Sequence, residues 1–282
     1  MPDYTDSILR LKNALDSADA VFIGAGAGLS AAAGLTYGGA RFEKYFGDMR
    51  ERFAISDMYS AGFYPFPDEG SFWAFWSRNI YYNRYAAETN DCYELLRELL
   101  SGKDYFVVTT NVDHCFQNAG FDKERLWYMQ GDYGLFQCSF PCTEDTYDNE
   151  AIIRQMIEKQ EDMRVPPELF PRCPKCGRKM TLNLRVDDTF VQDEGWHKAR
   201  ERYDAFRECA LHGRVLYLEL GVGMNTPIWI KYPFISGTHD NPLAVYACIN
   251  KGEAYAPREI SSRAICIDGD IRDVLKKLHD SK

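Results

Sequence analysis

The chain has 282 residues, 45% of them hydrophobic and 27% charged, which is typical of a folded protein with one large domain or one domain plus an insert. Its net charge of −9 disfavours long, non-specific contacts with nucleic acid or with an anionic membrane. No apolar run reaches the roughly 20 residues that cross a bilayer, and the first residues lack the pattern of a signal peptide. We therefore expect a cytoplasmic protein whose partners include neither nucleic acid nor membrane.

Short strands that alternate with helices indicate the fold class. An amphipathic helix is expected over Asp6–Ala18, and the run AVFIGAG follows it and ends in glycines, as a buried parallel strand does. Further helices are expected at Cys92–Leu100 and at IRDVLKKLHD, and further strands at DYFVVTTN, Leu126–Met129, RVLYLELGVG, PLAVYACIN and AICID. This alternation predicts an α/β protein with a Rossmann-like parallel sheet flanked by helices.

The turn Gly24–Gly28 lies between the first strand and a segment suited to a helix start. Glycines there permit a tight turn and let backbone N–H groups approach a pyrophosphate, although such turns also serve packing. Ser30 would add a hydroxyl to the same anion site or cap the helix. A dinucleotide fingerprint also needs an acid at the end of a second strand, and Asp48, at the expected distance, follows no strand. This departure disfavours a hydride-transferring dehydrogenase.

Four cysteines form two closely spaced pairs. Cys138 and Cys142 have C-x3-C spacing, and Cys173 and Cys176 have C-x2-C spacing within RCPKCGRKM. Two such pairs about thirty residues apart converge on one tetrahedral zinc ion in zinc ribbons. Because four thiolates leave no open position, the metal would hold the fold together and would not activate water. The sequence therefore predicts a structural zinc site.

Several motifs resemble the sirtuin family over most of the chain. GAGLSAAAGL from Gly26 is similar to the family's nucleotide loop, VVTTNVDHCFQNAG from Val107 to its second motif, and MQGDYGLFQC from Met129 to the motif that holds the catalytic histidine. GVGMNTP from Gly221 corresponds to the later glycine loop, and GDIRDVLKKL from Gly269 resembles the closing nucleotide contact and helix. The resemblance implies NAD as co-substrate, cleavage of its nicotinamide–ribose bond, and a structural zinc ion.

The resemblance also implies roles for individual residues. Asn111 would hold the nicotinamide ribose or a water beside it, Asp113 would hold the carboxamide, and Gln130 stands where the family has its catalytic histidine. We expect these three to be the catalytic residues. The residues expected to bind NAD, some of them the same, are Gly26, Ala27, Gly28, Ser30, Gly34, Leu35, Asn111, Asp113, Gln130, Gly221, Gly223, Asn225, Asn250 and Ile271.

The chain departs from the usual sirtuin pattern at three places. Gln130 replaces the histidine, Thr36–Gly39 replaces a Pro-Asp-Phe-Arg run, and Val222-Gly223 replaces a Thr-Ser pair. These departures look like the microbial class M sirtuins, which are encoded beside macrodomain proteins and act as protein ADP-ribosyltransferases. The resemblance implies that the acceptor is a lipoylated carrier similar to the glycine cleavage H protein. It also implies a macrodomain partner that reverses the modification.

The replacement of histidine by Gln130 bears on whether the protein catalyses deacylation or ADP-ribosyl transfer. A general base needs a pKa near the working pH and a free lone pair, and an amide does not titrate in that range. Loss of a general base typically costs 10²–10⁴-fold in rate, so we expect slow deacylation at best. NAD-dependent deacylation and a non-catalytic NAD or ADP-ribose sensor remain the alternatives to ADP-ribosyl transfer. His114 adjoins Asp113, but in an extended segment it would point away from it.

Two segments interrupt the expected Rossmann-like domain. Residues 42–89 are rich in aromatic side chains, which predicts a packed helical layer or a wall that faces the substrate. Residues 138–204 contain the four cysteines and are expected to form a zinc-binding module. We assign both to a smaller lobe and assign residues 1–41, 90–137 and 205–282 to the NAD-binding domain. NAD and acceptor would then meet in the cleft between the lobes.

Overall fold

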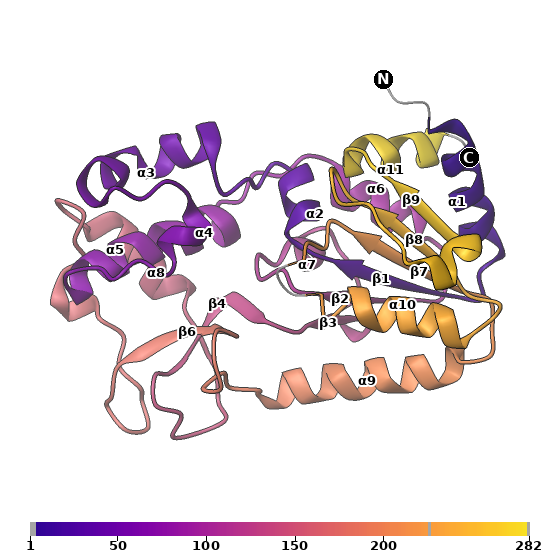
Figure 1. Cartoon of the computed structure of the whole chain (residues 1–282). Helices are drawn as coiled ribbons and strands as arrows, with labels where there is room; N and C mark the ends of the chain where they lie inside the picture. The colour runs from indigo at the N-terminus through magenta and orange to yellow at the C-terminus, as the bar shows by residue number, and fades with distance from the viewer. Residues whose placement is uncertain (1–3, 225–226, 281–282) are drawn as a thin grey trace.

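A computed structural model describes residues 4–224 and 227–280 and shows two lobes side by side (Figure 1). The large lobe contains a six-stranded parallel sheet with helices on both faces, and the small lobe contains a helical layer and a three-stranded antiparallel sheet. In these ranges no helix has both the length and the apolar character needed to cross a membrane.

The large sheet has the strand order β3-β2-β1-β7-β8-β9, with every neighbouring pair parallel. Its strands are β1 (Ala20–Ala25), β2 (Tyr105–Thr109), β3 (Leu126–Tyr128), β7 (Val215–Leu220), β8 (Val245–Ile249) and β9 (Ala264–Ile267). This is the doubly wound Rossmann order, and the direction of winding reverses between β1 and β7. The α/β fold expected from the sequence is confirmed.

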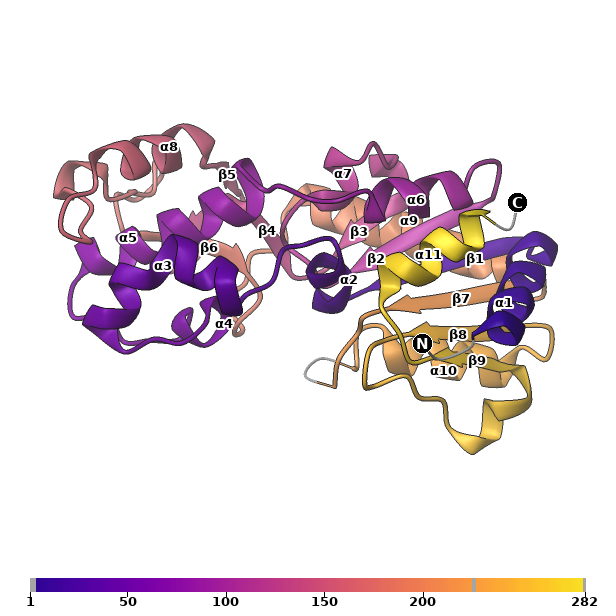
Figure 2. The ribbon, with the colours of Figure 1, turned by 90° about the horizontal axis from the view of Figure 1, so that it is seen from above.

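Two helical layers cover this sheet (Figure 2). One layer consists of α1 (Thr5–Ser17), α2 (Ala27–Ala32), α6 (Cys92–Leu99), α7 (Cys115–Asn118) and α11 (Ile271–Asp280). The other consists of α9 (Glu194–Ala210) and α10 (Lys231–Asp240), with the short 3-10 helices η2 (Lys123–Arg125) and η4 (Arg258–Arg263) at the edges. The strands of this sheet are almost wholly buried because both faces are covered, which explains their continuous apolar runs.

The small lobe is built around an aromatic core. Its helices are α3 (Gly39–Phe53), α4 (Met58–Ala61), α5 (Glu69–Ile80), the π-helix η1 (Tyr81–Tyr85), α8 (Glu150–Lys159) and the 3-10 helix η3 (Pro167–Leu169). Its sheet has the order β5-β4-β6, made of β5 (Tyr147–Asp148), β4 (Gly131–Cys138) and β6 (Met180–Leu184). Trp73 of α5 meets Phe136 of β4 edge to face at 5.2 Å, so the helical layer packs directly on the sheet.

The structure moves two of the expected domain boundaries. β4 was expected within the Rossmann-like range 90–137, but it pairs with β5 and β6 and buries Tyr133 and Phe136 in the small-lobe core. Most of α9 was expected within the zinc-binding module, but Trp196 and Ala199 pack in the core of the large lobe. The small lobe therefore takes residues 39–85 and 131–184. The reason is strand pairing and helix packing, which the spacing of cysteines does not reveal.

Candidate active site and metal centre

A cavity of about 630 Å³ opens where the lobes meet. Its large-lobe side is formed by the loops that follow β1, β2, β7 and β8, and so lies at the carboxyl ends of the strands and at the reversal point of the sheet. Rossmann-like folds bind their ligands at this position, and the volume lies within the range of small-molecule sites. From these loops Gly26, Ala27, Gly28, Asn111, Gly221, Gly223 and Asn250 line the cavity.

The glycines after β1 allow a close contact between two loops. A Cβ atom on Gly28 would come within 2.6 Å of the Cα atom of Gly221, so no larger residue fits there. The N–H groups of Gly26 and Gly28 donate to the carbonyl oxygens of Leu220 and Gly221, both at 3.0 Å. These two amides therefore hold the loop after β7, and the contact between the two loops shapes this side of the cavity.

Two asparagines stabilise the cavity walls. The side chain of Asn111 donates to the carbonyl oxygen of Gly26 at 2.9 Å, and its own backbone N–H donates to the Thr109 hydroxyl at 3.0 Å. The side chain of Asn250 donates to the carbonyl oxygen of Val222 at 3.2 Å. Each amide therefore ties its own loop to a glycine loop, while its remaining polar atom is available to a ligand.

Gln130 lines the cavity from the turn between β3 and β4. The next residue, Gly131, has φ +95°, and a Cβ atom there would come within 1.9 Å of the carbonyl oxygen of Asn183. Only glycine fits this backbone, because other residues rarely adopt positive φ and would clash. The backbone of this turn therefore fixes the position of Gln130. Among the described residues, no histidine lines the cavity.

Ser30 and Asp113 lie behind the cavity wall. The Ser30 hydroxyl donates to Asp113 at 2.5 Å and is 3.1 Å from the hydroxyl of Tyr93, while the backbone N–H of Cys115 donates to the other carboxylate oxygen of Asp113 at 3.0 Å. Burial raises the pKa of Asp113, against the hydrogen bonds that lower it. Neither residue lines the cavity, so the structure places this pair as an inner support of the Asn111 loop.

Arg185 is a cavity residue that the sequence did not point out. It follows β6, and its guanidinium lies over the rings of Phe190 and Trp229 at 4.5 and 4.9 Å. Its Nη2 atom is buried without a hydrogen-bond partner among the described residues, and burial lowers the pKa of the side chain. A half-buried guanidinium that pairs with no carboxylate among the described residues is costly, so its position beside Gln130 indicates an anionic ligand.

The small lobe supplies an aromatic and aliphatic wall. Tyr59, Phe63 and Val186 line the cavity and are 56%, 65% and 68% exposed, which places them at its mouth. Deeper in, the wall is formed by Tyr37, Met58, Phe72, Trp76, Tyr133, Leu182 and Leu184. The aromatic segment, residues 42–89, therefore packs as a helical layer, and some of its side chains also line the cavity.

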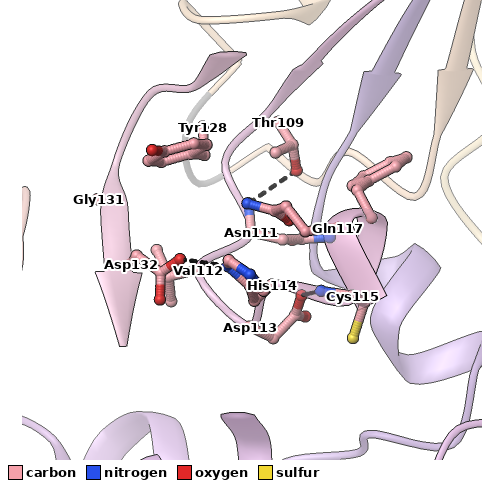
Figure 3. A pocket seen from close by; sticks show the side chains of 11 residues that line it. Thr109, Asn111, Val112, Asp113, His114, Cys115, Gln117, Tyr128, Gly131 and Asp132 are labelled. Carbon is pink, nitrogen blue, oxygen red and sulfur yellow. Dashed lines mark hydrogen bonds and ion pairs between the residues drawn. The ribbon is translucent and has the colours of Figure 1, made fainter. Parts of the chain in front are cut away.

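Next to this cavity, the ring of His114 contacts a buried carboxylate (Figure 3). Its Nδ1 atom is 2.7 Å from Asp132, which also accepts a hydrogen bond from Arg84 at 2.8 Å. His114 has φ +67° and is not extended, so it faces Asp132, whereas Asp113 faces Ser30. Neither His114 nor Asp132 lines the large cavity; both border a space of about 10 Å³, which holds one water molecule at most.

The four predicted zinc ligands come together in the small lobe. Their Sγ atoms lie within 4.8 Å of one another, with Cys138 and Cys176 3.7 Å apart and Cys142 and Cys173 3.6 Å apart. A tetrahedral ion with Zn–S bonds of about 2.3 Å requires sulfur separations of about 3.8 Å, so the thiols fit zinc. Burial raises the pKa of Cys173, but the backbone N–H groups of Cys176 and Lys175 outweigh this effect and lower the pKa to about 7. The lowered pKa favours the thiolate form that binds zinc.

None of the known protein-family models matches the chain. The fold is similar to that of Sir2Tm bound to a propionylated peptide, with a TM-score of 0.64 at 17% identity over 97% of this chain and 98% of that chain. A structure of a Sir2 enzyme gives a TM-score of 0.62 at 20% identity, covering 98% and 97%. Likeness at this level of identity establishes the fold.

Curated relatives decide the family. The chain is 39% identical over 276 residues to a Staphylococcus aureus (strain Mu50 / ATCC 700699) protein named "Protein ADP-ribosyltransferase", covering 98% of this chain and 88% of that protein. The chain belongs to the sirtuin-type protein ADP-ribosyltransferases. A Fusarium oxysporum f. sp. cubense protein named "Probable bifunctional ADP-ribose hydrolase/ADP-ribosyltransferase" is 31% identical over 295 residues, which cover 96% of this chain but 49% of that protein. This sirtuin-type chain thus spans about half of the second relative.

Some of the residues expected in a sirtuin-type site lie away from the cavity. Gly34 ends α2 with φ +105°, Leu35 is buried and donates its N–H to the Ser30 carbonyl oxygen at 2.8 Å, and Ile271 is buried in the core at the start of α11. These three residues and the Ser30–Asp113 pair support the loops and do not line the cavity. Asn225 falls outside the described residues.

Proposed function

We propose that this protein cleaves the nicotinamide–ribose bond of NAD and transfers the ADP-ribose to a side chain of an acceptor protein. The observation that carries the proposal is Gln130, which borders the cavity together with Asn111 at the site where ordinary sirtuins have a histidine. The name of the Staphylococcus aureus relative supports the same reaction. In the transfer, the bonding electrons leave with nicotinamide, and a nucleophile of the acceptor forms the new bond to the ribose carbon.

The polar end of the cavity suits bond cleavage. Nicotinamide departure proceeds through an oxocarbenium-like state that is helped by orientation and by fixed dipoles, and Asn111 and Gln130 supply neutral dipoles from rigid turns. Gln130 accepts a hydrogen bond from a ribose hydroxyl but does not take its proton. Deacylation requires such a proton transfer, so this site favours capture by an acceptor over deacylation.

We further propose that the acceptor is a lipoylated carrier protein similar to the glycine cleavage H protein. A lipoyl-lysine arm is long, uncharged and largely apolar, and the small-lobe wall with Phe63, Trp76 and Val186 offers it apolar contacts. A second partner, an ADP-ribose hydrolase of the macrodomain type, would remove the modification. The Fusarium relative, whose name joins a hydrolase and a transferase, supports a link between the two activities.

The test uses labelled NAD, this protein, and a carrier protein in lipoylated and unmodified forms, followed by intact mass analysis. We expect label and one ADP-ribose mass on the lipoylated carrier, and loss of both with Asn111→Ala. Nicotinamide release with O-acyl-ADP-ribose from an acylated peptide, and no labelled protein, would instead identify a deacylase. Binding of NAD without release of nicotinamide would identify a sensor.

A further inference from the structure

The carboxylate of Asp132 joins three segments of the chain. Asp132 is the second residue of β4, and its side chain is 7% exposed. One oxygen accepts hydrogen bonds from Arg84 at 2.8 Å and from the backbone N–H of Gly134 at 2.7 Å, and the other is 2.7 Å from Nδ1 of His114. Every oxygen of this buried carboxylate thus has a donor, and two of the donors come from other segments.

Arg84 brings the end of the helical layer to this point. It lies in η1, where the helix widens to a π-helix, a rare form that frequently occurs at functional sites. Its guanidinium lies over the ring of Tyr85 at 5.2 Å and is 16% exposed. The π-turn therefore directs a well-packed cation at Asp132 just before the chain returns to the large lobe.

His114 brings the large-lobe loop to the same point. It lies three residues after Asn111, and Figure 3 shows its ring directed at Asp132. Its left-handed backbone is uncommon for a residue other than glycine, and such conformations persist where the surroundings hold them. The hydrogen bond between Nδ1 of His114 and Asp132 holds this conformation.

We propose that Asp132, with His114 and Arg84, is a positioning residue that fixes the Gln130 turn against the Asn111 loop. Gln130 lies two residues before Asp132, and Asp132, His114 and Arg84 do not line the large cavity, so they act through Gln130 and Asn111. Burial alone would raise the pKa of Asp132, but the hydrogen bond from His114 and the charge of Arg84 outweigh it and lower that pKa. The proposal rests on the proposed function, because it concerns the alignment of the same reacting groups.

The first test compares Asp132→Asn with Asp104→Asn, which makes the same chemical change in an exposed ion pair with Arg125. We expect Asp132→Asn to lower kcat for nicotinamide release about 100-fold, the loss typical of a misplaced catalytic group, with little change in the Kd for NAD. Asp104→Asn should match the wild type. Equal kcat for the wild type and Asp132→Asn would overturn the proposal.

A second pair of variants separates the hydrogen bond between His114 and Asp132 from the backbone conformation of His114. Both His114→Asn and His114→Gly tolerate the left-handed conformation, but only the asparagine amide keeps a donor for Asp132. We expect His114→Asn to retain most of kcat and His114→Gly to lose as much as Asp132→Asn. The same kcat in both variants would overturn the proposal, and this comparison remains available if Asp132→Asn does not fold.

Hydrogen exchange provides a measurement that does not depend on the reaction. In the proposed arrangement, amides of residues 110–114 and 129–133 exchange faster in Asp132→Asn and His114→Gly than in the wild type, and unchanged exchange there would overturn it. A wild type that releases no nicotinamide with any acceptor would refute the proposed function alone. In that case, faster exchange in the two variants would still support the positioning role.

Discussion

The carbonyl oxygen of Gln130 accepts a hydrogen bond from the backbone N–H of Arg185 at 3.1 Å. Gln130 directly precedes Gly131, the first residue of β4, and Arg185 directly follows Leu184, the last residue of β6. Gly131 and Leu184 are paired in the sheet. One strand pair of the small lobe therefore positions both Gln130 and the guanidinium of Arg185, which has no carboxylate partner in the described part of the chain. The amide that would orient the ribose and the cation that would receive an anion are held at a fixed separation by backbone hydrogen bonds.

Replacing Arg185 should weaken the use of NAD, whose pyrophosphate is the anion that the proposed function supplies. We expect Arg185→Ala to lower kcat/KM for NAD about 100-fold, since a partly desolvated charge pair is lost, and we expect Arg185→Lys to restore little, because lysine does not stack on the rings of Phe190 and Trp229. Steady-state kinetics with saturating acceptor measure this. Arg200→Ala is the matched control, since Arg200 approaches the ring of Trp196 from an exposed position; the same loss in both variants would contradict the assignment.

Replacing Gln130 should impair the chemical step. Gln130→Ala removes the hydrogen bond to the ribose, and we expect kcat for nicotinamide release to fall by about 10- to 100-fold. Gln130→His introduces a group that titrates near neutral pH, so a new dependence of the rate on pH should appear between about pH 6 and 7. Pre-steady-state release of nicotinamide across this range measures both. Gln155→Ala, an exposed change on α8, should leave every rate unaltered.

A methyl group at Gly28 should separate the two glycine loops. Gly28→Ala places a Cβ atom 2.6 Å from the Cα atom of Gly221, so one of the loops must shift. We expect the affinity for NAD to fall at least tenfold, as measured by calorimetry. Gly47→Ala is the contrasting variant, because it lies inside α3 with 3.8 Å to the nearest atom and should raise the free energy of unfolding by up to about 1 kcal/mol. Unchanged NAD affinity in Gly28→Ala would show that the loop contact does not shape the site.

Metal removal should affect the small lobe first. We expect one zinc ion per chain by elemental analysis, and a fall in Tm on the order of 10 °C after chelation or in Cys173→Ser, because the free energy of metal binding at the four cysteines adds to the free energy of folding. The near-ultraviolet signal of Trp73 should change with it. Cys209→Ser, at an exposed cysteine outside the cluster, should keep both metal and Tm. A full zinc content in Cys173→Ser would refute the four-thiolate site.

The buried carboxyl of Asp113 should make stability depend on pH. Its pKa is raised in the folded state, so in the unfolded state the group loses its proton at a lower pH than in the folded state. The contribution of Asp113 to stability is therefore complete below the unfolded pKa of about 3.9 and is lost as the pH rises through the folded pKa. Asp113→Asn avoids this loss while its amide still serves Ser30 and Cys115. In urea unfolding, the free energy of unfolding of the variant minus that of the wild type should increase from about pH 4 to neutrality; a difference that decreases as the pH rises would contradict this.

The sequence was sufficient for the sheet and the metal centre, since both depend on local patterns. Buried strands ending in glycine turns located β1, β2 and β7, and cysteine spacing located the zinc ligands, which the structure brings within reach of one ion. Site residues could be predicted from the sequence only where a residue of a sequence motif also lines the cavity, as Asn111 and Gln130 do. Arg185 could not be found in the sequence for two reasons. Its Nη2 atom has no hydrogen-bond partner among the described residues, and its guanidinium stacks on aromatic rings, and only the structure shows both features. Likewise, the burial of Asp113 depends on Ser30, 83 residues away.

The small lobe is assembled from two stretches, since the chain leaves the large lobe after α2 and returns before α6, then leaves after β3 and returns before α9 (Figure 1). The two stretches share one core, in which Trp73 from the first packs on Phe136 from the second. A fragment of the chain that carries one stretch alone would therefore lack part of this shared core. In the proposed function, changes at the mouth residues Tyr59, Phe63 and Val186 would alter the choice of acceptor and leave the glycine loops untouched.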